Sequence, residues 1–226
     1  MTNFVSMNRE IQVTADGSHT IVIPGSNLSY HSHHGAVQES MHVFVEAGLL
    51  PVLANTGNES IHILEIGFGT GLNALLSLRE AISHQRNINY TAFEKFPVTI
   101  EEAARINHGA LLSMEEIFKQ LHAAAWGEKV LINEFFTIEK KQVSLPASID
   151  TSPVHLIYMD AFSPDAQPEL WTAEFFTSVF EVLVPGGLLV TYCSKSIVRR
   201  AMTAAGFRVE KIPGPRGKRE MVRAWK

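Results

Sequence analysis

The sequence predicts an α/β fold in which helices cover both faces of a mostly parallel sheet. Three observations lead to this prediction. Beyond residue 60, short apolar runs alternate with segments of helical periodicity. Several of these runs are uninterrupted, which is typical of strands buried on both faces. A glycine-rich turn, residues 67–71, lies between the first apolar run and the first helical segment, as in βα units.

The elements can be assigned in order along the chain. Residues 10–30 predict a small hairpin with a turn at Asp16-Gly17, and residues 36–50 predict a helix that Pro51 closes. The strands expected after it are 61–66, 89–94, 130–136, 155–159, 188–193, 207–212 and 220–225, and the helices are 72–83, 98–107, 113–124, 168–183 and 196–205. Pro185-Gly186-Gly187 is expected to be a turn. The last two strands form a hairpin, so the expected seven-stranded sheet ends antiparallel.

The same pattern divides the chain near residue 58. Residues 1–58 are a predicted N-terminal extension, a small hairpin plus a helix packing on the core, and residues 59–226 are the predicted main domain. With 226 residues, 46% of them hydrophobic, the chain can bury a sizeable core. No apolar run reaches the roughly 18 residues of a membrane span. The first ten residues lack the pattern of a signal peptide, so a cytoplasmic protein without membrane association is expected.

Charge and cysteine content restrict the function further. The net charge is −4, yet residues 195–226 hold ten of the 19 Lys and Arg residues and only Glu210 and Glu220 as acids. A local basic surface of this kind binds phosphate groups; the alternative is a solvated basic tail. Cys193 is the single cysteine, which excludes an internal disulfide and a multi-cysteine zinc site. Its apolar neighbours predict a small buried residue.

The glycine-rich turn carries the first chemical signal. Residues 64–71 read Leu-Glu-Ile-Gly-Phe-Gly-Thr-Gly. Glycines allow a sharp turn and the close approach of a ligand at the carboxyl edge of the sheet. The Gly-x-Gly-x-Gly spacing differs from the dinucleotide pattern, and Glu65 would repel a pyrophosphate. The same acid can pair, directly or through water, with the cationic amino-acid end of S-adenosyl-L-methionine, which is therefore the predicted ligand. A plain strand–helix turn is the alternative.

Two further acids end predicted strands. Glu94 closes the strand 89–94, where an acid can accept both ribose hydroxyls of a nucleoside; a solvated acid is the alternative. Asp160 follows the strand 155–159 and is expected at the same sheet edge. A carboxylate there can position an amine and help remove its proton, although a helix cap or turn before Pro164 would also place an Asp.

Three histidines, His31, His33 and His34, are close-set on a predicted loop. No second cluster of ligands accompanies them, so no metal is expected and their role stays open.

Taken together, these motifs resemble the MnmC methyltransferase domain and its stand-alone form, MnmD, over about residues 26–221. The matching strings are Tyr30-His31-Ser32, 35–45, 64–73, 93–97, 160–164, 168–171, 185–187, 198–200, 205–207 and Lys218-Arg219-Glu220-Met221. The glycine turn and the Pro-Gly-Gly string are common to many methyltransferases, whereas the others are more specific in this order. The resemblance implies the Rossmann-like class I methyltransferase fold.

The resemblance also implies a reaction. The enzyme would use S-adenosyl-L-methionine to methylate the amine of 5-aminomethyl(-2-thio)uridine at the tRNA wobble position, giving 5-methylaminomethyl(-2-thio)uridine. Because the chain ends at Lys226, no oxidase domain is expected and a separate upstream enzyme would supply the aminomethyl group. The expected partner is the anticodon region of tRNA.

The resemblance assigns residues to these roles. Asp160 would be catalytic. The expected cofactor-binding residues are Glu65, Gly67, Phe68, Gly69, Thr70, Gly71, Asn73, Glu94, Lys95 and Asp160, and the expected substrate-binding residues are Tyr30, Phe162, Lys195, Arg199, Lys218 and Arg219. Related enzymes often place an acid near the adenine after the third strand, but the register of residues 133–139 leaves that contact open.

Two other functions remain as alternatives. An aminopropyltransferase of the spermidine synthase type shares the fold and an aspartate near an amine, but it would use decarboxylated S-adenosyl-L-methionine and need no basic surface. A catalytically inert cofactor-binding or tRNA-binding module would bind without turnover and be indifferent to Asp160→Ala. The glycine spacing disfavours an NAD dehydrogenase. The oligomeric state and the preferred tRNAs are not determined by the sequence.

Overall fold

The computed structural model describes residues 9–57, 59–146 and 149–226. Residues 1–8 and 58, which belong to the predicted N-terminal extension, lie outside the described residues. The small N-terminal strands are β1 (Glu10–Val13), β2 (His19–Ile23) and β3 (Leu28–Ser29); those of the main sheet are β4 (Ile61–Ile66), β5 (Ile88–Glu94), β6 (Lys129–Asn133), β7 (Phe136–Gln142), β8 (Val154–Met159), β9 (Leu183–Thr191), β10 (Arg208–Pro213) and β11 (Glu220–Trp225).

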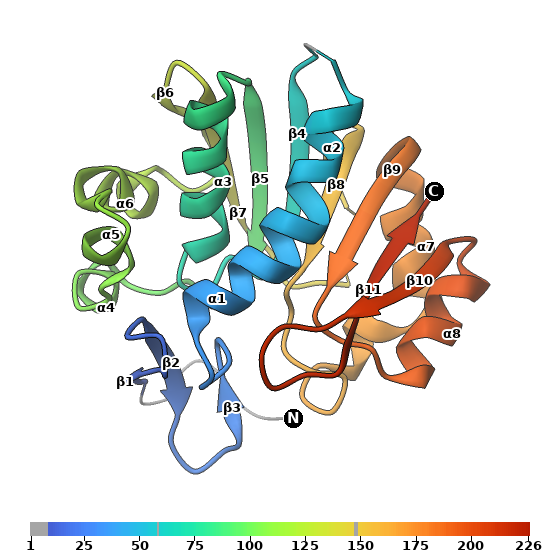
Figure 1. Ribbon diagram of the computed structural model, residues 1–226, viewed down its shortest axis with the longest axis horizontal. Helices are drawn as coiled ribbons and strands as arrows, with labels where there is room; N and C mark the ends of the chain where they lie inside the picture. Colours follow the sequence, from blue (N-terminus) through green and yellow to red (C-terminus); the bar gives the residue numbers. More distant parts are fainter. Residues whose placement is uncertain (1–8, 58, 147–148) are drawn as a thin grey trace.

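The main sheet has the order β10-β11-β9-β8-β4-β5-β7-β6. Strands β4, β5, β7, β8 and β9 are parallel, whereas β11 pairs antiparallel with β9 and β10 with β11. Helices cover both faces and the small antiparallel sheet β1-β2-β3 lies beyond one edge (Figure 1). The α/β class, the mostly parallel sheet and the antiparallel C-terminal hairpin are therefore confirmed.

The sheet has eight strands where seven were expected. The segment 130–136 was expected to be one strand, but the chain reverses at Glu134-Phe135, where the Asn133 side chain accepts a hydrogen bond of 2.9 Å from the Phe135 amide. Strand β6 then pairs antiparallel with β7, which continues to Gln142 and places Phe136, Ile138 and Lys140 on its buried face. A hydrogen bond from a nearby backbone amide to an asparagine side chain competes with strand pairing. It marks a turn here that the apolar periodicity does not indicate.

The helices are α1 (Ala36–Ser40), α2 (Leu50–Asn55), α3 (Leu72–His84), α4 (Ile100–Ala103), α5 (His108–Leu111), α6 (Glu115–Ala123), α7 (Ala173–Val182) and α8 (Ser196–Ala204), with π-helical bonding over Met41–Leu49 and a 3₁₀ turn over Pro168–Trp171. The first helix thus continues past Pro51. The expected helix 98–107 is reduced to α4, which a Thr99–Glu102 capping box starts. The expected turn 185–187 lies within β9, where Gly186 has φ +78° and the pairing with β8 shifts register.

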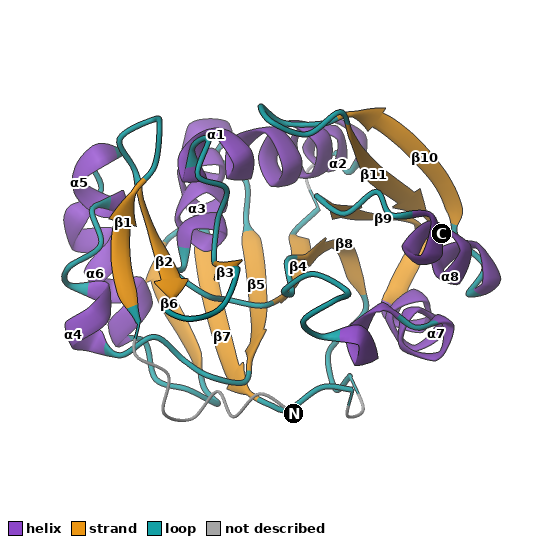
Figure 2. Cartoon of the chain, turned by 90° about the horizontal axis from the view of Figure 1, so that it is seen from below, coloured by secondary structure: helices purple, strands orange, loops and turns teal. Residues whose placement is uncertain are grey.

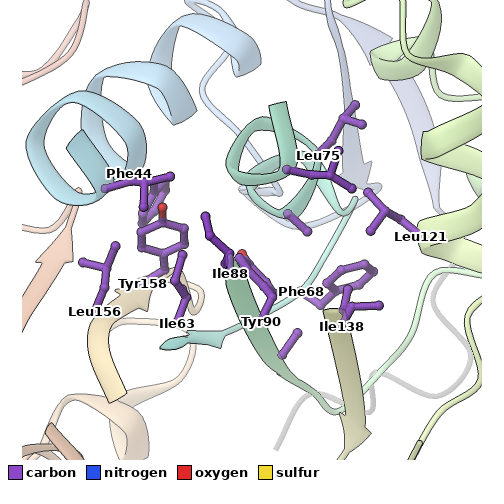
Figure 3. Close-up of a cluster of buried hydrophobic side chains, with 14 of the residues drawn as sticks. Phe44, Ile63, Phe68, Leu75, Ile88, Tyr90, Leu121, Ile138, Leu156 and Tyr158 are labelled. Carbon is purple, nitrogen blue, oxygen red and sulfur yellow. The ribbon is translucent and has the colours of Figure 1, made fainter. Parts of the chain in front are cut away.

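The N-terminal helical segment packs directly on the main sheet. The Phe44 and Tyr158 rings lie 5.1 Å apart between centroids (Figure 3). Both belong to the same buried cluster as Ile63, Leu75 and Ile138. A second cluster on the opposite face includes residues of α7 and α8. One hydrophobic core contains residues from both sides of residue 58. The predicted division of the chain at that residue therefore rests on the sequence pattern alone and stays a prediction.

The carboxyl ends of the parallel strands meet at one edge of the main sheet. Gly67 follows β4, Glu94 ends β5, Asp160 follows β8 and Tyr192 follows β9. The small β1-β2-β3 sheet covers this end of the molecule, as the view from that side shows (Figure 2). The strand order changes direction between β4 and β8, which is where open α/β sheets bind ligands. Among the described residues, no helix is long and apolar enough to cross a membrane.

Candidate active site

A cavity of about 370 Å³ opens at this edge of the sheet. That volume suits a small ligand. The predicted site residues that line it are Tyr30, Gly67, Phe68, Gly69, Thr70, Asn73, Glu94, Lys95, Asp160, Phe162 and Lys218. Five other predicted residues lie outside its lining: Glu65, Gly71, Lys195, Arg199 and Arg219.

The turn after β4 needs glycine for two reasons. Gly67 has φ +98°, and a Cβ there would lie 2.6 Å from the backbone oxygen of Asp160. Gly69 has φ +50°, and a Cβ there would lie 3.1 Å from the Tyr30 ring. Side chains at these positions would therefore both strain the backbone and fill the space between the two strand ends. The backbone of the turn is consequently exposed to whatever occupies the cavity.

The side chains of Phe68 and Thr70 are held away from the cavity centre. The Phe68 ring lies in the hydrophobic core (Figure 3). It packs against Trp126 and His122. The Thr70 hydroxyl lies 2.7 Å from Nε2 of His31 and 3.2 Å from Nε2 of His108. Both side chains thus anchor the turn, and the cofactor contacts expected at Phe68 and Thr70 stay predictions.

The three predicted loop histidines do not act together. His31 is buried against Thr70, and burial lowers its pKa to about 4, so the imidazole is neutral at physiological pH. His33 and His34 also line the cavity, but neither shares the contact of His31 with Thr70. In the ranges that the structure describes, no group of three or more His, Cys, Asp and Glu side chains could hold a metal ion.

Glu94 is fixed in place at the end of β5. Its Oε2 accepts a hydrogen bond of 3.1 Å from the Gly69 amide, and its Oε1 accepts one of 2.7 Å from the Phe96 amide. The carboxylate therefore connects the glycine turn with the strand beside it. Lys95 is exposed at the rim, with Nζ 5.1 Å from the Phe96 ring centroid. Next to this rim the cavity is lined by Val143 and Leu145, which follow β7, so apolar side chains occupy the position where an adenine-contacting acid was sought.

Asn73 joins two carboxyl groups. Its Nδ2 donates hydrogen bonds of 2.9 Å to Glu65 and 2.8 Å to Asp160. Burial raises the pKa of Glu65 well above its ordinary value, and the neighbouring Asp160 raises it further. Burial likewise raises the pKa of Asp160, with Glu39 adding to the effect. Glu65 is fully buried. Its carboxyl group can therefore act on a ligand in the cavity only through the side-chain amide of Asn73.

The cavity lining also contains an aromatic pair. The rings of Tyr30 and Phe162 lie 5.3 Å apart between centroids, in an edge-to-face arrangement. Phe162 is held by its backbone: its amide donates to Gln167, and its carbonyl accepts a hydrogen bond of 2.8 Å from the Trp171 indole. The two rings come from the N-terminal segment and from the loop after β8, and the fold brings them together as the substrate prediction requires.

Two residues that line the cavity, Glu39 and Tyr192, were missed from the sequence. Glu39 is an acid on the buried face of α1, three residues after Ala36 and four before Val43. An acid at core spacing in an amphipathic helix was the available signal. Lys218 pairs with it: Nζ lies 2.7 Å from a Glu39 carboxylate oxygen and 4.0 Å from the Tyr192 ring centroid. Lys218 thus lines the cavity as part of an ion pair, and its role in substrate binding stays a prediction.

A family model described as S-adenosyl-L-methionine-dependent methyltransferase matches residues 114–226, half of the chain. The chain belongs to this family. The predicted cofactor, S-adenosyl-L-methionine, is thereby confirmed. The match starts before β6 and includes Asp160, the C-terminal hairpin and Lys218.

Curated relatives confirm the resemblance to the MnmC methyltransferase domain. The chain is 32% identical over 205 residues to the tRNA 5-methylaminomethyl-2-thiouridine biosynthesis bifunctional protein MnmC of Cupriavidus metallidurans, covering 85% of this chain and 30% of that protein. The corresponding protein of Aeromonas salmonicida is 28% identical, with 82% and 30% covered. The methyltransferase described here therefore spans about a third of the length of these relatives.

Solved structures agree. MnmC2 from Aquifex aeolicus superposes with a TM-score of 0.75 at 27% identity, covering 97% of this chain and 70% of that one. The CurJ carbon methyltransferase, at a TM-score of 0.51 and 14% identity, shares the fold alone.

The remaining basic residues of this methyltransferase lie outside the cavity. Lys195 forms an ion pair of 2.5 Å with Asp165, and Arg199 donates to the Ser194 carbonyl and the Ser196 hydroxyl. Arg200 and Arg219 are exposed. Cys193 is buried, as expected. The basic segment thus divides into Lys218, which faces the cavity, and an outer surface on α8 and the hairpin.

Proposed function

We propose that this chain transfers a methyl group from S-adenosyl-L-methionine to the amine of 5-aminomethyl(-2-thio)uridine at the wobble position of tRNA. The observation that carries the proposal is the position of Asp160. It lines the same cavity as the glycine turn and contacts Asn73, and an aromatic pair lines that cavity too. The names of the MnmC relatives support the same substrate class.

The residues at the sheet edge fit the cofactor. The glycine turn leaves a cradle that a single Cβ at Gly67 or Gly69 would fill. Two buried polar atoms beside it, Oε2 of Glu65 and Oδ1 of Asn73, have no hydrogen-bond partner among the described residues. Glu94 would hold the ribose hydroxyls, and Val143 would lie along the adenine. When bound, S-adenosyl-L-methionine supplies a methyl group on a sulfonium, whose departing sulfur is neutral and needs no acid from the protein.

Asp160 would act on the proton of the substrate. An alkylamine resembles lysine, with a pKa of about 10.4, and is a nucleophile only after losing its proton. The ionised Asp160 would hold the ammonium, orient its nitrogen and take the proton directly or through water. Because burial raises the pKa of Asp160, its carboxylate has a higher proton affinity than an ordinary aspartate and is better matched to this task. Positioning then supplies most of the remaining rate enhancement.

The uridine would have to leave the anticodon stack to reach the cavity, as bases do in other base-modifying enzymes. Tyr30 and Phe162 offer aromatic surface to a base there. The exposed Arg200 and Arg219 would contact phosphates near the anticodon, which positions an RNA without reading its sequence. An earlier reaction would supply the aminomethyl group, and the methylation would take place in the cytoplasm with tRNA.

Nucleoside mass spectrometry tests the proposal. Purified protein, labelled S-adenosyl-L-methionine and tRNA carrying 5-aminomethyluridine should give labelled 5-methylaminomethyluridine, and tRNA without the aminomethyl group should give none. A parallel reaction with decarboxylated S-adenosyl-L-methionine and putrescine should give no spermidine. Cofactor binding without any labelled nucleoside would overturn the proposal in favour of an inert binding module, and spermidine formation would overturn it in favour of aminopropyl transfer.

A further inference from the structure

An ion pair inside the cavity joins the N-terminal segment to the C-terminal hairpin. Lys218, in the hairpin turn, and Glu39, on α1, are separated by 179 residues in sequence, and their charged atoms lie 2.7 Å apart. The other Glu39 oxygen accepts a hydrogen bond of 2.7 Å from the Ser32 amide. The Glu39 side chain is only 9% exposed. Both carboxylate oxygens are therefore committed, and the acid is held in one position.

Lys218 is positioned as firmly as its partner. Its Nζ lies 4.0 Å from the Tyr192 ring centroid, over the face where an aromatic ring attracts a cation. The Tyr192 hydroxyl donates a hydrogen bond of 2.8 Å to the carbonyl of Ala161, the residue after Asp160. Lys218, Glu39 and Asp160 all line the same cavity. A surface lysine that only contacts phosphate needs none of these supports.

The surroundings of Asp160 are otherwise acidic or neutral. The groups that face it are Glu39 from α1, Glu65 from β4, Tyr90 and Glu94 from β5, Tyr192 after β9, and Lys218 from the hairpin. Lys218 is the cation in this set. Glu39 raises the pKa of Asp160 and Lys218 lowers it, on top of the increase that burial causes. A buried acid beside unpaired acids tends to keep its proton.

We propose that Lys218, through its ion pair with Glu39, is a positioning residue that keeps Asp160 ionised and so able to take the proton of the acceptor amine. Lys218 neutralises the charge of Glu39. Without Lys218, the uncompensated negative charge of Glu39 would raise the proton affinity of Asp160. The enzyme would then need a higher pH to reach its active form. This role rests on the proposed function for its consequence in catalysis, but the charge coupling itself can be measured without tRNA.

Carbon NMR of the aspartate carboxyl groups measures the coupling directly. The chain has four aspartates, Asp16, Asp150, Asp160 and Asp165, so protein labelled at Asp Cγ gives a simple spectrum that Asp160→Asn assigns. The titration midpoint of Asp160 is followed in the wild type, Lys218→Met, Glu39→Gln and the double variant. Lys119→Met is the matched control, because Lys119 forms ion pairs with Glu115 and Glu116 on the exposed face of α6.

The two single variants should shift the midpoint in opposite directions. Lys218→Met should raise it by about one pH unit or more, the usual effect of losing a nearby opposite charge. Glu39→Gln should lower it, because Lys218 is then left facing Asp160. The double variant should return to within about 0.3 unit of the wild type, and Lys119→Met should not move. An unmoved midpoint in both single variants overturns the proposal. A rise in Lys218→Met that persists in the double variant also overturns it, because Lys218 would then act without Glu39.

Activity supplies the second readout. The acid limb of the kcat/KM profile for aminomethyl-tRNA should move in the same direction and by a similar amount as the NMR midpoint in each variant, while cofactor affinity changes less than about threefold. If the midpoints move and the profiles do not, Asp160 is coupled but is not the proton acceptor, and the inference fails. If the wild type methylates no tRNA while the midpoints move as expected, the proposed function fails and the coupling stands.

Discussion

The proposed cofactor side of the cavity and its proposed acceptor side are assembled differently. The cofactor side comes mainly from residues 67–73 and Glu94, on adjacent parallel strands, and much of its surface is backbone. The acceptor side is made of side chains from distant segments: Tyr30, Glu39, Phe162, Tyr192 and Lys218. We therefore expect substitutions on the two sides to impair binding in different ways. The cofactor side is sensitive to added volume, whereas the acceptor side is sensitive to lost charge or aromatic surface.

Asp160 lies where the two sides meet, and its replacement should have the largest effect. Asp160→Asn keeps the hydrogen bond from Asn73 within reach but removes the proton acceptor. We expect kcat to fall by about 10²–10⁴-fold, the usual range for a general base. The affinity for S-adenosyl-L-methionine, measured by calorimetry, should change less than about threefold. A comparable loss of cofactor affinity would assign Asp160 to the cofactor side instead.

Added volume at the turn should affect the cofactor side next. Gly67→Ala places a Cβ 2.6 Å from the Asp160 carbonyl oxygen at φ +98°. We expect the Kd for the cofactor to rise at least about tenfold, which corresponds to about 1.4 kcal/mol. Gly25→Ala is the matched control, because Gly25 has φ +76° and no neighbouring atom within 4 Å. It should lower Tm slightly and leave Kd unchanged; equal effects on Kd would mean that backbone strain alone is responsible.

Lost aromatic surface should affect the acceptor side alone. Phe162→Leu is a cleaner test than a change at Tyr30, whose ring lies against Gly69. We expect KM for aminomethyl-tRNA to rise about fivefold to fiftyfold, since base–aromatic stacking contributes about 1–3 kcal/mol. Steady-state kinetics at saturating cofactor measures this. A rise in the cofactor Kd of the same size would show that the two sides are not separable.

The last expected effect concerns stability rather than binding, and it comes from His31 and His122, which contact Thr70 of the turn. Burial lowers the pKa of His31 and of His122 to about 4, below the ordinary value of 6.5. The folded state therefore binds fewer protons than the unfolded state, and stability should fall as the pH drops from about 6.5 toward 4. At pH 5 His31 should account for about 2 kcal/mol of this loss.

Thermal unfolding followed at pH 7.5 and pH 5 tests the point. His31→Gln should show a smaller decrease in Tm between the two pH values than the wild type does. His84→Gln, at an exposed position on α3, should behave like the wild type. A wild-type Tm that is the same at both pH values would contradict the expectation.

The same difference between the two sides explains which site residues could be predicted from the sequence. The glycine turn, Glu94 and Asp160 each end an apolar strand, so local pattern plus the rule that parallel strands share a carboxyl edge brings them together. The acceptor side depends on which distant residues the fold places side by side. Lys218 was predicted to contact phosphate because its neighbours are basic, and only the fold shows that it turns toward Glu39. Phe68 was predicted to contact the cofactor because of its place in the motif, although its ring packs in the core.

Strand β6 was hidden for a similar reason. Apolar periodicity runs through residues 130–136, and a single asparagine bond decides that the chain reverses there. The fold class did not depend on this detail, because β6 is the terminal strand of the sheet, beyond the strands that hold the site.

The ion pair between Lys218 and Glu39 also has a consequence for synthesis of the chain on the ribosome. Domains begin to fold from the N-terminal side as they emerge. The glycine turn and the strands beside it emerge well before residue 218, so the nascent chain has Glu39 at the cavity wall before its cation arrives. Completion of the site therefore coincides with docking of the last hairpin, whose Met221 and Val222 are buried in the two core clusters.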